Sequence, residues 1–147
     1  MIDPDIIEGL KESFVGEVYA ANFAWQCYIN FKASAEHPSS YDTYHKYFKK
    51  NFKDESKHRD IFAKLLAGYG EDAVLPTMEI PLFHTIEEML LHQYKNEVST
   101  IERYTKLADV CGEAGQFGLQ SLFADLALDE EKDRQAIVKR LGYQPEI

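Results

Sequence analysis

Cysteine is scarce in this chain of 147 residues, which has only Cys27 and Cys111 and no CxxC pair. A disulfide framework and a four-cysteine iron or zinc site therefore both lack the residues that they need. No stretch reaches the eighteen or so consecutive apolar residues of a membrane span, so no membrane partner is expected. The opening residues, MIDPDIIEGL, lack the basic flank and apolar run of a signal peptide, and we expect a cytoplasmic protein.

Positive charge is also in the minority, with 16 Lys and Arg against 25 Asp and Glu and a net charge of -9. Nucleic-acid binding needs clustered Lys and Arg that neutralise phosphates, so we expect no nucleic-acid partner. Hydrophobic residues still make up 45% of the chain, which is enough for a packed core. The length of the chain is that of one domain, so residues 1–147 are expected to form a single domain.

Signals for β-strands are nearly absent, whereas apolar residues recur at helical spacing over long segments. The spacing predicts four helices, separated by breaks rich in Pro, Gly and Ser. They run from Asp3 and Pro4 to about Ala35, from Ser39 or Ser40 to Gly68 or Gly70, from His84 to about Val110, and from about Gln116 to Leu141. Asp3 is expected to cap the start of the first helix, and Gly142 the end of the last.

The segment GEDAVLPTMEIPL, residues 70–82, separates the second and third predicted helices. Its two prolines and its glycine exclude a continuous helix. The other two connections are short, so each joins its helices into an antiparallel hairpin. The sequence thus predicts an all-α bundle of two helical hairpins joined by a long crossover.

Each predicted helix carries a carboxylate in the middle of its apolar stripe, and these are Glu17, Glu55, Glu97 and Glu130. Nearly the same heptapeptide occurs twice, as DESKHRD at 54–60 and as DEEKDRQ at 129–135. In the first copy His58 follows Glu55 by three residues, and in the second Asp133 follows Glu130 by three. Buried carboxylates at matching depth require cations, because an isolated charge in a core is costly.

This arrangement resembles the ferritin-like di-iron carboxylate proteins, most closely bacterioferritin and more loosely rubrerythrin. The resemblance rests on Glu17, then Glu55-Ser56-Lys57-His58, then Glu97 and Glu130, and it covers nearly the whole chain. It implies a ferritin-like antiparallel four-helix bundle that binds two iron ions per chain. Manganese and zinc also suit glutamate and imidazole ligands.

The resemblance also implies a role for each candidate ligand. Glu17 and His58 would be terminal ligands of one metal, and Glu97 and Asp133 terminal ligands of the other. Glu55 and Glu130 would bridge the two ions. The four remaining histidines are expected at the surface, and these are His37, His45, His84 and His92.

Several features depart from the pattern of the family. Ser56 stands where haem-binding bacterioferritins carry methionine, so no haem is expected. Asp133 stands where the last ligand is commonly histidine, and five carboxylates (-5) with two divalent ions (+4) leave a net charge of -1 at the site. The chain has no cysteine-rich rubredoxin segment. We expect no fifth helix after the fourth, so the resemblance leaves open whether a cage forms.

The resemblance implies a ferroxidase-like oxidoreductase whose partners are Fe(II) and O2 or peroxide. Two alternatives stay open: a rubrerythrin-like peroxidase or small-substrate di-iron oxygenase, and a non-catalytic metal-binding helical dimer. A homodimer is expected in any of these cases, because residues 18–31, VYAANFAWQCYINF, hold no charge on any face of their helix.

Overall fold

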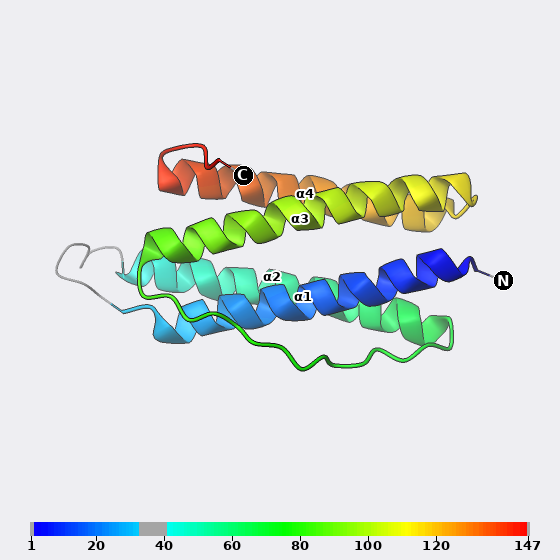
Figure 1. Ribbon diagram of the computed structural model, residues 1–147, viewed down its shortest axis with the longest axis horizontal. Helices are drawn as coiled ribbons and strands as arrows, with labels where there is room; N and C mark the ends of the chain where they lie inside the picture. Colours follow the sequence, from blue (N-terminus) through cyan, green and yellow to red (C-terminus); the bar gives the residue numbers. More distant parts are fainter. Residues whose placement is uncertain (1, 33–40, 147) are drawn as a thin grey trace. The chain divides into compact units, whose positions relative to one another are not determined.

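The computed structural model describes residues 2–32 and 41–146, and within these ranges the chain forms four α-helices and no strand (Figure 1). The helices are α1 (Pro4–Asn30), α2 (Tyr41–Gly68), α3 (Ile86–Glu113) and α4 (Phe117–Leu141). The prediction of an all-α chain is confirmed. None of these described helices is both long enough and apolar enough to cross a lipid bilayer.

The start of α1 follows the predicted cap. Oδ1 of Asp3 accepts a hydrogen bond from the backbone N–H of Asp5 at 2.8 Å, and Pro4 fills the first helical position. The helix ends at Asn30, earlier than the predicted end near Ala35, which lies outside the described residues. Nδ2 of Asn30 donates to the carbonyl of Gln26 at 3.0 Å in the last turn of the helix.

The chain divides into two compact units, and the first comprises Leu10–Met89. In this unit most of α1 lies antiparallel to α2 (Figure 1). The aromatic end of the hairpin packs into a buried cluster of apolar side chains, formed by Phe23, Cys27, Phe31, Phe48 and Met89. Burial of such side chains contributes roughly 1.5–3 kcal/mol each, so this cluster holds the hairpin together.

The predicted crossover is non-helical, as expected, and it runs along α1 (Figure 1). Glu71 lies 3.1 Å from the ammonium group of Lys11 near one end of α1. Near the other end, the side-chain amide of Gln26 donates to the carbonyl of Pro81 at 2.8 Å. The crossover is therefore tied to α1 at both ends by polar contacts.

The second unit comprises Met1–Gly9 and Leu90–Ile147. Here α3 and α4 lie antiparallel (Figure 1). The rings of Tyr104 and Phe123 pack between them, with 5.7 Å between their centroids. The predicted C-cap of α4 is confirmed, because Gly142 has φ +79° and its N–H donates to the carbonyl of Val138. A left-handed conformation of this kind favours glycine.

The bounds of α3 differ from the prediction at both ends. Thr85 caps the helix, since its Oγ1 accepts the N–H of Glu88 at 3.2 Å and donates to Oε1 of Glu88 at 2.8 Å. The helix therefore begins at Ile86 and not at His84. It also continues through Gly112, because one helical glycine costs only about 1 kcal/mol, and the chain turns at Gly115, where φ is +74°.

Candidate metal centre

Three candidate ligands lie together in the α1–α2 hairpin: Glu17 from α1, and Glu55 and His58 from α2. Nδ1 of His58 is 3.7 Å from Oε1 of Glu17 and 3.8 Å from Oε2 of Glu55. The side chain of Glu17 is 1% exposed, that of Glu55 7% and that of His58 13%. We call these three residues the α1–α2 ligand set.

The distances within the α1–α2 ligand set suit a shared cation better than direct hydrogen bonds. A hydrogen bond between nitrogen and oxygen spans about 2.7–3.2 Å, and both separations exceed this range. Ligand atoms about 2.0–2.2 Å from one metal ion are separated by at most roughly 4.4 Å. Both measured separations fall within this limit, so the imidazole and the carboxylates have the spacing of ligands to one ion.

The second set lies in the α3–α4 hairpin and consists of Glu97 from α3, and Glu130 and Asp133 from α4. One carboxylate oxygen of each residue lies within 4.8 Å of those of the other two. Glu130 is 1% exposed and Glu97 6% exposed, while Asp133 is partly buried. We call these three residues the α3–α4 ligand set.

The chemistry of both ligand sets fits a divalent cation. The α1–α2 ligand set combines two carboxylates with one imidazole, a mixture that suits iron, manganese and zinc. The α3–α4 ligand set contains three carboxylates and no nitrogen ligand, so it favours harder cations and carries one more negative charge. Three carboxylates in a mostly buried position repel one another strongly unless a cation neutralises them.

The remaining histidines only partly follow the prediction of surface positions. His84 is exposed, whereas His92 is partly buried, and burial together with the charge of Lys95 lowers the pKa of its imidazole. His45 is partly buried and stacks on the ring of Tyr28, with 4.2 Å between the ring centroids. His37 lies outside the described residues.

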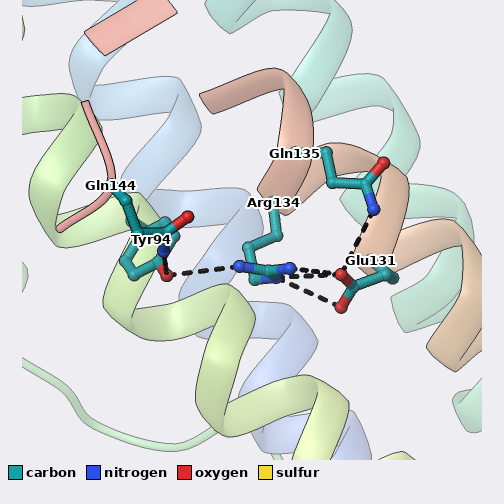
Figure 2. Close-up of polar contacts among 5 residues, drawn as sticks. All are labelled: Tyr94, Glu131, Arg134, Gln135 and Gln144. Atoms are coloured by element: carbon teal, nitrogen blue, oxygen red, sulfur yellow. Dashed lines mark hydrogen bonds and ion pairs between the residues drawn. The ribbon is translucent and has the colours of Figure 1, made fainter. Parts of the chain in front are cut away.

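A polar network beside the α3–α4 ligand set was missed by sequence reasoning (Figure 2). Arg134 donates from Nε to both carboxylate oxygens of Glu131 at 3.2 and 3.1 Å, and from Nη1 to the hydroxyl oxygen of Tyr94 at 3.3 Å. Gln144 donates to the same hydroxyl oxygen at 2.5 Å. The spacing of Glu131 and Arg134 along α4 is a visible sequence signal, but nothing in the sequence pairs either residue with Tyr94.

A comparison with family models matches residues 7–142 to the ferritin-like domain. The chain belongs to the ferritin-like family. The four helices, and the carboxylates that lie in the middle of each, agree with membership of this family. A comparison with curated protein sequences finds no match.

Solved structures of other ferritin-like proteins share the fold. A ferritin-like diiron-carboxylate protein from Bacillus anthracis superposes with a TM-score of 0.84 at 20% identity, covering 93% of this chain and 95% of that chain. A ferritin from Chlorobium tepidum has a TM-score of 0.79 at 14% identity, covering 97% of this chain and 85% of its own. The open pore ferritin from Archaeoglobus fulgidus also has a TM-score of 0.79 at 14% identity. The superposition covers 97% of this chain and 86% of that chain. The fold is a ferritin-like four-helix bundle, as the sequence predicts.

Proposed function

We propose that this ferritin-like protein is a non-haem di-iron protein that oxidises Fe(II) with O2 or peroxide. The observation that carries the proposal is the α1–α2 ligand set, where the imidazole of His58 faces two buried carboxylates at metal-sharing distances. The α3–α4 ligand set supplies a matching group of three carboxylates. Membership of the ferritin-like family makes iron the first metal to test.

In this proposal residues 1–147 act as one domain, in which the two ligand sets form a single two-metal centre. Glu17 and His58 are terminal ligands of the first metal, and Glu97 and Asp133 are terminal ligands of the second. Glu55 and Glu130 bridge the two ions. The repeat of the heptapeptide at 54–60 and 129–135 supports this equivalence of the two halves.

The proposed reaction balances with two Fe(II) ions. Reduction of one O2 to hydrogen peroxide takes two protons and two electrons, and each Fe(II) supplies one electron. Reduction of one hydrogen peroxide to two water molecules takes the same numbers of protons and electrons. The six ligands would hold two Fe(II) ions, which would supply both electrons to one oxidant molecule.

Asp133 makes the two metal positions unequal. Five carboxylates (-5) and two Fe(II) ions (+4) leave one negative charge, which favours oxidation to the more highly charged Fe(III). The aspartate arm is also one methylene group shorter than a glutamate arm. We therefore propose that the second position exchanges iron readily, which suits turnover of iron as a substrate better than a permanent cofactor.

We also propose that two chains associate through the outer face of α1. Three large apolar side chains on this helix are exposed: Val15 at 38%, Trp25 at 44% and Ile29 at 55%. The ring of Trp25 packs 5.0 Å from that of Phe52 on α2, so the apolar face extends over both helices. Exposed large apolar side chains on one helix commonly mark a protein interface.

Metal content and native mass, measured on protein purified without added metal, test these proposals together with stopped-flow oxidation of added Fe(II). Two iron ions per chain and rapid oxidation of Fe(II) under O2 or peroxide are the expected result. Stable zinc with no consumption of oxidant would contradict ferroxidase activity and support a non-catalytic metal-binding dimer. A monomeric native mass would contradict the proposed interface.

A further inference from the structure

The hydroxyl oxygen of Tyr94 accepts hydrogen bonds from two separate parts of the chain. Arg134 of α4 donates to it at 3.3 Å, and Gln144, which follows the end of α4, donates to it at 2.5 Å (Figure 2). Tyr94 itself lies on α3 and is 2% exposed. One buried oxygen therefore joins α3, α4 and the segment after α4.

Glu131 holds the guanidinium of Arg134 in this position. Nε of Arg134 donates to both oxygens of Glu131, and Nη2 donates to Oε1 (Figure 2). Hydrogen bonds to Glu131 and to Tyr94 raise the pKa of the guanidinium, and the hydrogen bond from Arg134 lowers the pKa of the Glu131 carboxyl. The fork geometry of arginine leaves Nη1 to reach Tyr94. We call Tyr94, Glu131, Arg134 and Gln144 the Tyr94 clamp.

The Tyr94 clamp lies within about one helical turn of the α3–α4 ligand set. Tyr94 precedes Glu97 by three residues, which is about 4.5 Å along the axis of α3. Arg134 follows Glu130 by four residues, about 6 Å along α4, and lies on the same face of the helix. The contact between Tyr94 and Arg134 therefore sets two features of the hairpin next to the three carboxylates. These are the distance between α3 and α4 and the register, which is the position of one helix along the other.

This register matters most for Asp133. An aspartate has one side-chain torsion fewer than a glutamate and a shorter arm, so it cannot follow a helix that shifts away from the metal. Ligating groups tolerate displacements of only about 0.5 Å before the geometry of a site is lost. A short ligand on α4 therefore requires a close and fixed contact with α3.

The turn at Gly142 allows the last part of the clamp to form. Gly142 has φ +79° and ends α4, and the chain then reverses so that Gln144 reaches Tyr94 on α3. The segment after the helix is thereby fastened to the hairpin that carries the α3–α4 ligand set.

We propose that the Tyr94 clamp positions Asp133 and Glu130 against Glu97 for the second metal, with Arg134 and Tyr94 as positioning residues. The clamp compensates for the short arm of Asp133 by keeping α4 close to α3 and in register. This inference rests on the proposed function, because it assigns a role toward the second metal of that centre.

Titration of metal-free protein with Co(II), followed by visible absorption and calorimetry, tests the clamp. Wild-type protein is expected to bind two Co(II) ions, the weaker at the α3–α4 ligand set. Tyr94→Phe removes only the hydroxyl oxygen, and we expect it to weaken the second ion about 10-fold and to leave the first unchanged, as is typical when a group supporting a ligand is lost. Arg134→Met should have the same effect.

Gln135→Ala is the matched control. Gln135 also donates to Oε1 of Glu131, at 3.4 Å, but it makes no described contact with Tyr94 (Figure 2). Its replacement should leave both Co(II) affinities unchanged. An equal loss of affinity in Gln135→Ala and Tyr94→Phe would contradict the clamp.

A rescue variant separates positioning from general stability. If Arg134 acts by keeping Asp133 within reach, then Asp133→Glu in the Arg134→Met background lengthens the arm and restores most of the lost affinity. A purely structural role predicts no restoration. Wild-type protein that binds fewer than two Co(II) ions would contradict the two-metal centre as well as the clamp. Two ions in wild type with unchanged affinities in Tyr94→Phe would overturn the clamp alone.

Discussion

Nδ1 of His58 lies 3.7 Å from Oε1 of Glu17, although the two residues belong to different helices. The two side chains lie in the middle of α1 and of α2, in the buried interior of the hairpin. Most side chains in such an interior are apolar. Glu55 completes the set from the adjacent turn of α2, with its Oε2 3.8 Å from the same nitrogen. Two carboxylates around one imidazole, nearly sealed from water, form a group that could hold a metal ion.

Glu55→Ala is expected to abolish the binding of two metal ions. Glu55 is the proposed bridging ligand from α2, so its loss removes one ligand from each ion. Equilibrium dialysis against Fe(II) under anaerobic conditions measures the stoichiometry. Asp54→Ala is the control, because Asp54 forms an ion pair with Lys50 on the outer side of α2. If Glu55→Ala still bound two ions, the assignment of Glu55 as a bridging ligand would be wrong.

Asp133→His is expected to tighten the second metal position about 10-fold. The imidazole supplies the nitrogen ligand that the α3–α4 ligand set lacks, and zinc and iron both bind it well. Competition with a chromophoric chelator measures the affinity at pH 7.5, where most of an ordinary imidazole is neutral. The same affinity in both proteins would show that residue 133 is not a ligand.

Trp25→Glu is expected to dissociate the proposed dimer. A charge in the centre of an apolar interface loses its hydration without gaining a partner, which costs several kcal/mol. Native mass spectrometry and sedimentation measure the change from dimer to monomer. Lys53→Glu is the control, because Lys53 is exposed on α2 and already polar. A dimer that survives Trp25→Glu would place the interface elsewhere.

Cys27 and Cys111 are expected to resist thiol reagents in the native protein. Burial raises the pKa of the Cys27 thiol to about 12, and burial also raises the pKa of Cys111. The reactive thiolate of Cys27 is therefore roughly a ten-thousandth of the population at pH 8. The rate of labelling by iodoacetamide, with and without denaturant, checks this. Fast labelling of folded protein would contradict the burial of these thiols.

The raised pKa of Cys27 also predicts a dependence of stability on pH. The folded protein holds the thiol proton more tightly than the unfolded chain does, whose pKa is near the ordinary value of 9.0. The contribution of Cys27 to the free energy of unfolding is therefore complete below about pH 9 and is lost as the pH rises toward 12. Cys27→Ala should reduce the steepness of alkaline unfolding measured by circular dichroism.

Two glycines at the ends of α4, Gly118 inside the helix and Gly142 just after it, should respond to alanine in opposite directions. Gly142→Ala is expected to destabilise the protein by about 1 kcal/mol, because a side chain is strained at φ +79°. Gly118 lies within α4, has no positive φ, and has open space where a Cβ would stand. Gly118→Ala is therefore expected to stabilise by up to about 1 kcal/mol. Urea unfolding measures both changes, and equal signs would contradict this account of the α4 termini.

Helix positions were largely predictable from the sequence, and the errors have local causes. The cap at Asp3, the non-helical crossover and the C-cap at Gly142 were all predicted. The end of α1 at Asn30, the Thr85 cap and the passage of α3 through Gly112 were not. At the two ends of α3 a single side-chain contact and one tolerated glycine decided the boundary, and periodicity averages over such details.

The candidate ligands were also chosen from the sequence, because a carboxylate that interrupts an apolar stripe is visible without a structure. Their spacing placed Glu55 with His58, and Glu130 with Asp133, on single helix faces. The roles as metal ligands remain predictions that the variants above test. The Tyr94 clamp could not be predicted, since its contacts join residues of α3, α4 and the chain beyond Gly142.

The sequence by itself determined that the chain is helical, where its turns fall and which acidic groups enter the core. These properties follow from backbone preferences and from the 3.6-residue period, which act between near neighbours in the chain. Only the tertiary structure decided the separation of His58 from Glu17, the path of the crossover along α1 and the meeting of Arg134 with Tyr94. Such contacts depend on the packing of whole helices against one another, and the periodicity of a single helix does not encode the distance to its neighbour.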